Sequence, residues 1–166
     1  VTKIVPHLHP CGVEILSIFI QSNSNGFNAV NQLMKPADVD IDKYSVGQIL
    51  QAVKEAGVVG LGGAAFPTHI KLNPPKDMPI QALLVNGCEC EPYITADHRL
   101  LLEKAQEILV GSKLAAKAVG AKQIIFGIET NKKDAVKLLR NFIRENPEQG
   151  FDNGMEVVEL ATKYPQ

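Results

Sequence analysis

Short apolar runs along the 166-residue chain predict β-strands, because they are bounded by turn residues and are too short for ordinary helices. The predicted strands are Val13 to Ile20, Ile80 to Val85, Lys122 to Thr130, and Met155 to Leu160. The second run reads as a buried strand, since most of its residues are apolar.

Apolar residues at helical spacing predict three helices between these strands. The first runs from Ser45, its N-cap, to Ala56 and stops at Gly57. The second runs roughly from Ala96 to Val119 and closes at a glycine. Asn131 is expected to cap the third helix. The apolar face of this third helix consists of Ala135, Leu138, Leu139 and Phe142.

The second half of the chain therefore alternates strand, helix, strand, helix, strand. That order predicts a parallel sheet with right-handed crossovers. The predicted fold class is α/β, with a Rossmann-like parallel sheet and flanking helices. A polar segment at 21–26 follows the first strand, and a domain boundary is expected there.

The segment from Gly60 to Lys71 is almost free of side chains until it reaches an aromatic residue, a proline and a lysine. Glycine permits positive φ and close ligand approach, and successive N–H groups can hold a phosphate or an electron-rich ring. The segment is not a Walker loop, which ends in Gly-Lys-Ser/Thr. As a Rossmann fingerprint it has the permitted alanine, Ala65, but it follows a predicted helix instead of a strand. A tight turn between closely packed elements is the alternative interpretation.

A polar and acidic cluster directly follows the predicted strand from Ile80 to Val85, and it reads Asn86-Gly87-Cys88-Glu89-Cys90-Glu91-Pro92-Tyr93. Ligands bind beyond the carboxyl ends of strands in open α/β sheets. An asparagine both donates and accepts, and carboxylates accept hydrogen bonds from a ribose diol, so the cluster suits a nucleotide-like ligand. The alternative is an acidic loop before a helix, with Glu91 and Asp97 near the helix dipole.

Together, the glycine-rich segment and the Asn86-x-x-Glu89-x-Glu91-Pro92 segment resemble the flavin and NADH site of the RnfC subunit of Rnf electron-transport complexes. A more distant version of this site occurs in the NADH-oxidising flavoprotein subunit of respiratory complex I. Cobalamin reductases and the electron-transfer protein associated with clostridial proline reductase are similar as well. The tandem motifs are specific to this superfamily but do not separate its members.

The resemblance implies FMN and NADH as cofactors, with hydride transfer to the flavin and no catalytic side chain. The cofactor-binding residues it implies are Gly60, Gly62, Gly63, Ala64, Phe66, Lys71, Asn86, Cys88, Glu89, Glu91 and Tyr164. Lys71 is expected near the flavin phosphate or ring, and Phe66 on NADH. Asn86 and Glu89 would address the isoalloxazine, and Glu91 the NADH side.

The resemblance also predicts the division of the chain. Residues 1–25 resemble the C-terminal strands of a lipoyl-like β-barrel, residues 26–44 form a linker, and residues 45–166 resemble the first part of an FMN/NADH-binding domain. The chain is therefore expected to be a fragment. In a full family member, the rest of the flavin site, a β-rich domain and a cysteine-rich domain with two [4Fe-4S] clusters follow.

Composition narrows the expected partners. The formal charge of -1 gives no electrostatic reason to expect nucleic acid, and no apolar run is long enough to span a bilayer. The three cysteines make no recognisable metal framework, so no metal site is predicted within the chain. The resemblance implies peripheral attachment on the cytoplasmic side of the membrane through other Rnf subunits, with ferredoxin or another iron-sulfur partner exchanging electrons.

Two other functions stay open. The chain is alternatively a soluble flavin reductase module that serves a corrinoid or proline reductase, or a non-catalytic scaffold. The scaffold is favoured by three departures, since Leu61, Ala65 and Cys88 stand where the complex I relatives carry Arg, Gly and Asp. A cysteine is only a weak hydrogen-bonding substitute for an aspartate. The retained Asn86, Glu89 and Glu91 argue against the scaffold.

Overall fold

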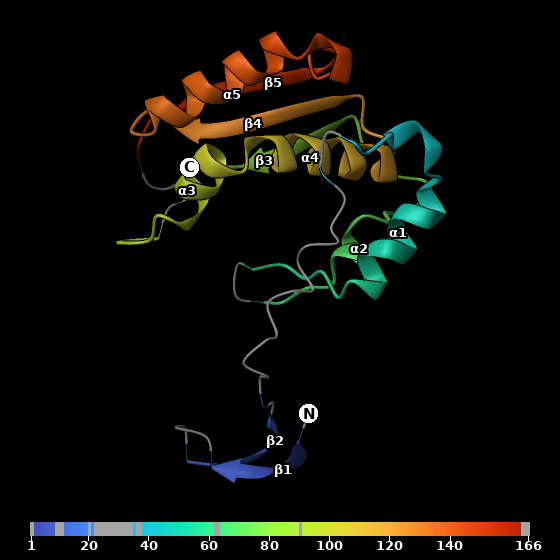
Figure 1. Ribbon diagram of the computed structural model, residues 1–166, viewed down its shortest axis with the longest axis vertical. Helices are drawn as coiled ribbons and strands as arrows, with labels where there is room; N and C mark the ends of the chain where they lie inside the picture. The colour runs from blue at the N-terminus through green and yellow to red at the C-terminus, as the bar shows by residue number, and fades with distance from the viewer. Residues whose placement is uncertain are drawn as a thin grey trace. The chain divides into compact units, whose positions relative to one another are not determined.

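The chain forms two compact units, Val1–Met34 and Lys35–Gln166, which are drawn in Figure 1. The computed structural model describes residues 2–8, 12–19, 21, 35, 38–61, 64–89 and 91–163. The lipoyl-like barrel and the linker at 26–44 stay predictions.

The first unit contains an antiparallel strand pair. Strand β1 (Lys3–Leu8) pairs with β2 (Glu14–Phe19), so the strand predicted in this region is confirmed. Large apolar side chains such as Leu8 and Leu16 are exposed. Two strands alone bury little apolar surface, and an isolated hairpin is therefore marginally stable.

A three-stranded parallel sheet is the centre of the second unit. Strand β4 (Gln123–Glu129) lies between β3 (Ala82–Asn86) and β5 (Met155–Leu160), and both pairings are parallel. The predicted strands and the α/β class are confirmed. Because all three strands run the same way, their carboxyl ends meet at one edge of the sheet.

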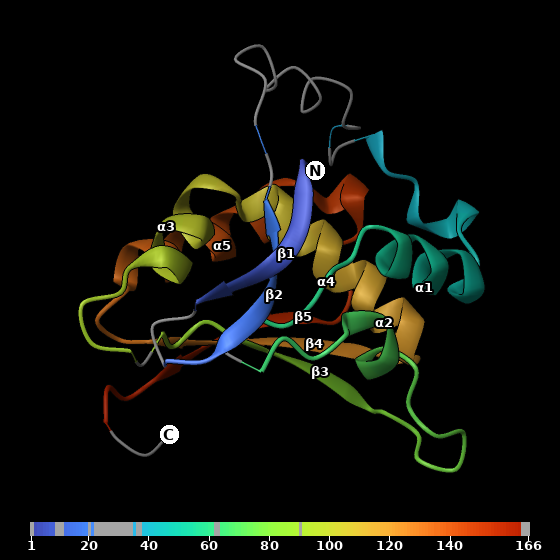
Figure 2. The same ribbon diagram turned by 90° about the horizontal axis from the view of Figure 1, so that it is seen from below.

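Helices α3 (Ala96–Glu103), α4 (Ala105–Val119) and α5 (Lys133–Glu145) lie on one face of this sheet (Figure 2). Alternate residues of β4 point into the resulting core, as a half-covered strand requires. The most deeply buried large side chains are Phe126, Phe151, Leu109, Ile128 and Leu139. They come from β4, from both longer helices and from the turn before β5, so a single core holds these elements together.

The predicted helix from Ala96 to Val119 is wrong as one element, because it breaks at Lys104. The Lys104 backbone leaves the helical region, with φ -131° and ψ 32°. Neither glycine nor proline stands at the break, and packing distinguishes the two segments. Both helices contact α5, and α4 also packs against β3, β4 and α1.

The structure also corrects the prediction that Asn131 caps the third helix. Helix α5 begins at Lys133, its N-cap position is Lys132, and no side chain caps it. The Asn131 amide instead donates to the Glu129 carboxylate at 2.8 Å. The predicted apolar face of α5 is confirmed, with Ala135 and Leu139 fully buried.

Strand β3 is an edge strand, which corrects its interpretation as buried. It pairs with β4 on one side, and its Leu84 side chain is 73% exposed. Leu84 points away from the helix-covered face, because its neighbours Leu83 and Val85 pack against the core.

Helix α1 (Val46–Glu55) precedes the glycine-rich segment and is capped as predicted. Ser45 and Gln48 form a capping box, in which the serine hydroxyl accepts from the Gln48 amide and the glutamine side chain accepts from the Ser45 amide. Gly57 follows with φ 66° and ends the helix. A short helix α2 (Thr68–Lys71) follows the loop. Two 3-10 turns, η3 (Ile41–Lys43) and η4 (Pro147–Gln149), complete the described elements of this unit.

We expect Ser45→Ala to lower the free energy of unfolding by about 1 kcal/mol, because it leaves a first-turn amide of α1 without its acceptor. Urea denaturation measures the loss. Ser17→Ala is the control, since among the described residues that hydroxyl donates to the exposed Ile15 carbonyl alone. Equal losses in the two variants would contradict a stabilising cap.

Candidate functional site

The glycine-rich segment is a loop closed by a short antiparallel bridge between Val59 and Pro67. The Gly60 amide donates to the Phe66 carbonyl at 2.9 Å, and the Thr68 amide donates to the Val58 carbonyl at 3.1 Å. The base of the loop is therefore fixed by backbone hydrogen bonds that depend on no side chain.

The exposed part of this loop carries groups that a ligand can use. The backbone amides of Ala64 and Ala65 donate to no described residue, and Ala65 has a positive φ of 49°. The Phe66 side chain is 52% exposed although it is aromatic. Lys71 is exposed at the last position of α2. The predicted Gly62 and Gly63 contacts lie outside the described residues.

A second loop begins where β3 ends, as the sequence predicts. The Asn86 side-chain oxygen accepts from the Cys88 amide at 3.0 Å, so the asparagine shapes the turn. Its side-chain nitrogen donates to no described residue. The Gly87 amide donates to the Gly127 carbonyl at 2.8 Å, and the buried Cys88 thiol lies 3.7 Å from the same oxygen. This loop is thus attached to β4 by its backbone and by Cys88.

Glu89 serves as a cap for helix α3. Its two carboxylate oxygens accept from the Asp97 amide at 2.6 Å and from the His98 amide at 3.1 Å. These are first-turn amides, which lack partners within the helix. The Glu89 backbone has a positive φ of 53°, which is rare for a residue with a side chain. Glu89 therefore has the role that the alternative interpretation gave this cluster, that of an acidic residue at the start of a helix.

Acidic groups gather around this cap. Burial raises the pKa of the Asp97 carboxyl, and the negative charges of Glu89 and Glu91 raise it further, while Lys132 acts in the opposite direction. The Glu91 side chain is exposed, and its carboxylate accepts no hydrogen bond from a described residue. Glu91 is therefore available to a ligand, unlike Glu89.

Asp97→Asn is expected to change the pH dependence of stability. The folded state raises the pKa of Asp97 above 3.8, so it disfavours the ionised form. The wild-type protein therefore loses stability relative to the variant as pH rises from 3.8 through the folded-state pKa. Urea denaturation at about pH 3 and about pH 7 should give the variant its larger relative advantage at the higher pH. An advantage independent of pH would contradict the shift.

His98 connects the start of α3 to α5. Its Nε2 lies 2.8 Å from the Asp134 carboxylate. Hydrogen bonds from His98 and from the Ala135 amide lower the pKa of Asp134. This contact holds the capped helix end beside the carboxyl end of the sheet.

Three residues that the sequence analysis did not assign to the site lie beside the second loop: Glu129 at the end of β4, and Asn131 and Lys132 just after it. The buried Lys132 ammonium donates to the Cys88 carbonyl at 2.6 Å, to the Glu129 carboxylate at 3.2 Å and to the Asn131 side-chain oxygen at 3.2 Å. Glu129 is buried as well. The sequence did contain a signal for these residues. A glutamate, an asparagine and a lysine stand at the end of the predicted strand that follows β3, and the carboxyl ends of neighbouring parallel strands converge.

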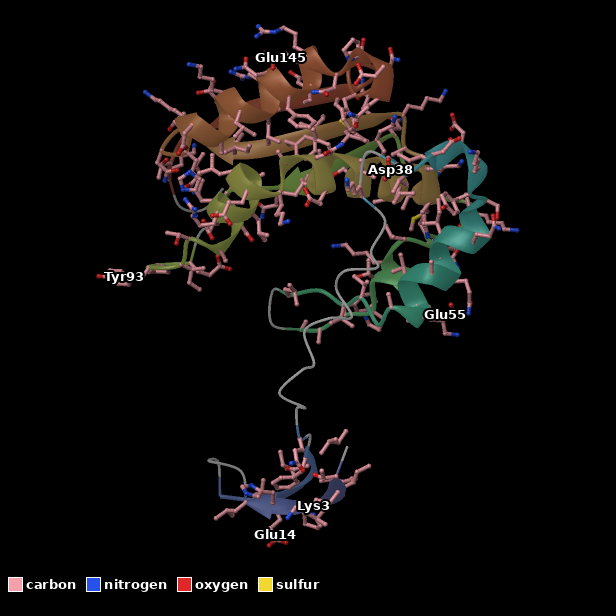
Figure 3. The ribbon with its side chains drawn as sticks, viewed as in Figure 1. Lys3, Glu14, Asp38, Glu55, Tyr93 and Glu145 are labelled. Carbon is pink, nitrogen blue, oxygen red and sulfur yellow. The ribbon has the colours of Figure 1, made fainter. Side chains whose placement is uncertain are left out.

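Figure 1 shows how the two loops are arranged in this unit. The glycine-rich loop extends from α1 and α2 in the direction in which β3 runs, on the side of the sheet where β3 is the edge. The second loop turns away from the end of β3, and Tyr93 points outward from it in Figure 3. Tyr164, predicted to line the same site, lies outside the described residues.

In the described part of the chain, the His, Cys, Asp and Glu side chains form no cluster of three or more that could hold a metal ion. None of the described helices has the length and apolar character needed to cross a membrane.

Residues 53–166 match the Nuo51 FMN-binding domain family. The chain is 41% identical over 158 residues to the C subunit of a Na(+)-translocating ferredoxin:NAD(+) oxidoreductase complex from Acetobacterium woodii, covering 95% of this chain and 34% of that relative. It is 38% identical over 131 residues to the C subunit of a proton-translocating ferredoxin:NAD(+) oxidoreductase complex from Clostridium ljungdahlii, covering 79% of this chain and 27% of the relative.

A solved structure of an NAD+-reducing [NiFe]-hydrogenase in the H2-reduced state is similar with a TM-score of 0.64 and 27% identity, over 75% of this chain and 23% of the hydrogenase chain. The chain thus spans about a third or less of the length of the relatives it matches.

Proposed function

Because the chain belongs to the Nuo51 FMN-binding domain family, we propose that its two loops hold FMN and address NADH within the RnfC-type subunit of an ion-translocating ferredoxin:NAD oxidoreductase complex. The observation that carries the proposal is the loop at the carboxyl end of β3. Among the described residues, the Asn86 side-chain nitrogen and the Glu91 carboxylate have no hydrogen-bond partner. Both groups lie beyond the carboxyl end of a strand, where open α/β sheets bind nucleotides.

The hydrogen-bond donors and the positive charge of the described residues match the polar groups of FMN. The Asn86 side-chain nitrogen suits a carbonyl oxygen of the flavin ring, and the Ala64 and Ala65 amides, which donate to no described residue, suit an anionic group. Lys71 supplies a positive charge near the same loop. Gly60, Gly62 and Gly63 would allow the backbone to approach the cofactor.

Other predicted contacts have more specific roles in this proposal. Phe66, half exposed on the glycine-rich loop, offers an aromatic face to NADH. Glu91 accepts hydrogen bonds from the NADH ribose. Glu89 and Cys88 act through the shape of the loop, since one caps α3 and the other is buried against β4. Tyr164 remains part of the proposed site.

The chemistry supplied by bound FMN is acceptance of a hydride from NADH and release of the electrons one at a time. The chain contributes binding and orientation, and the proposal assigns no catalytic acid or base to it. The two [4Fe-4S] clusters would belong to another part of the protein. Other members of the complex would provide attachment to the cytoplasmic face of the membrane, and ferredoxin would exchange electrons with the assembly.

The test is titration of the intact protein with FMN, followed by anaerobic addition of NADH while the flavin absorbance near ~450 nm is recorded. Binding followed by bleaching is the expected result. Binding without bleaching would limit the proposal to a flavin site fed by another donor. The absence of FMN binding would overturn it and favour the scaffold.

A further inference from the structure

A buried ion pair lies beneath the loop that follows β3. Lys132 is 7% exposed and Glu129 is 6% exposed, and the ammonium lies 3.2 Å from the carboxylate. The shortest contact of the ammonium is with the Cys88 carbonyl, at 2.6 Å. Lys132 therefore connects the end of β4 to the backbone of the neighbouring loop.

Stability alone is a weak reason for burying such a pair. Removing two charges from water is costly, and apolar replacements of buried pairs are often as stable or more stable. The ammonium here also makes a charge-assisted hydrogen bond to a carbonyl 44 residues away in the sequence, which an apolar side chain cannot reproduce. This bond points to a role in fixing the loop.

The position of that carbonyl explains what is fixed. It belongs to the peptide between Cys88 and Glu89, close to Asn86. Glu89 has a positive φ of 53°, and such a conformation persists only where its surroundings hold it. Lys132 holds this peptide from below, while the α3 amides hold the Glu89 carboxylate.

We propose that Lys132 is a positioning residue that fixes the backbone from Asn86 to Glu89, and thereby sets the direction of the Asn86 amide toward FMN. Glu129 and Asn131 hold the ammonium in place through the two other contacts. The FMN part of this inference rests on the proposed function, and the loop part does not.

The test compares Lys132→Met with Leu139→Ala in the intact protein. Methionine keeps the apolar length of lysine but cannot donate to the Cys88 carbonyl. Leu139 is fully buried in α5, so its truncation destabilises the core without removing a hydrogen bond to the loop. Amide hydrogen exchange without FMN is the first readout, at Gly87 and Cys88, whose amides are hydrogen-bonded.

In Lys132→Met we expect exchange at Gly87 and Cys88 to accelerate at least tenfold more than exchange across β5. In Leu139→Ala the two regions should change together. The dissociation constant for FMN, from quenching of flavin fluorescence, should rise at least tenfold in Lys132→Met and stay within twofold in Leu139→Ala. If the methionine variant does not fold, Glu129→Gln takes its place, with the same expected direction of exchange.

Exchange at Gly87 and Cys88 that is no faster than in β5 would overturn the positioning role, whether or not FMN binds. Selective loop exchange with an unchanged FMN dissociation constant would overturn the link to the cofactor. Failure of the wild-type protein to bind FMN would contradict the proposed function and the cofactor link, while the exchange result would still decide the role of Lys132 in the loop.

Discussion

Gly154→Ala is expected to lower the free energy of unfolding by about 2–4 kcal/mol. Gly154 has φ +85°, a conformation that costs energy for any residue with a side chain. A Cβ at this position would lie 2.6 Å from the Lys122 carbonyl oxygen, which is backbone and cannot rotate away. The Gly154 carbonyl accepts from the Ile124 amide at 2.7 Å, so a shift here disturbs the start of β4 and β5.

Gly111→Ala is the matched control for this prediction. Gly111 lies inside α4, and a Cβ there meets no atom within 4 Å. Alanine in a helix interior is expected to stabilise the protein by about 0.5–1 kcal/mol. Urea denaturation of both variants gives the comparison. A Gly154→Ala variant as stable as the wild type would show that the turn before β5 adjusts without strain.

Glu91→Ala is expected to lower kcat/KM for NADH oxidation by about a hundredfold, a loss of about 3 kcal/mol of transition-state stabilisation. The dissociation constant for FMN should stay within twofold. Glu91 is exposed, and its carboxylate accepts no hydrogen bond from a described residue. The substitution should therefore cost little stability and leave the FMN site intact. The proposed partner of Glu91 is the NADH ribose.

Anaerobic NADH oxidation and FMN titration of the intact protein measure these two quantities. Glu145→Ala is the control, because Glu145 is an exposed glutamate on α5 that points away from the sheet in Figure 3. It should change neither quantity. Equal losses of FMN binding and NADH oxidation in Glu91→Ala would contradict the assignment of Glu91 to the NADH side.

Much of the second unit follows from short-range signals in the sequence. The capping box at Ser45 and the glycine after α1 operate within a few residues, so their effect does not depend on the rest of the fold. The strand periods and the order of strands and helices predict the parallel sheet because few other arrangements satisfy them. The loop after β3 is placed at a sheet edge by the same argument.

Two of the wrong predictions arise where contacts with distant segments decide the exposure or the backbone conformation of a residue. Leu84 is apolar, but its exposure depends on whether anything covers the second face of β3. Lys104 has good helix propensity, yet the helix breaks there, and the segment after the break packs on β3 and β4 in addition to α5. The third, Asn131, is decided locally, because its side chain donates to Glu129 two residues earlier instead of capping α5.

The sequence by itself determined the class of fold, the two loops and the family, because propensity, period and motif are properties of neighbouring residues. Only the tertiary structure decided how the acidic loop is used. It assigned Glu89 to the amides of α3, left Glu91 exposed, and placed Lys132 under the Cys88 carbonyl. Hydrogen bonds and burial are decided by what lies nearby in space, and the contact from Lys132 joins residues 44 positions apart in the chain.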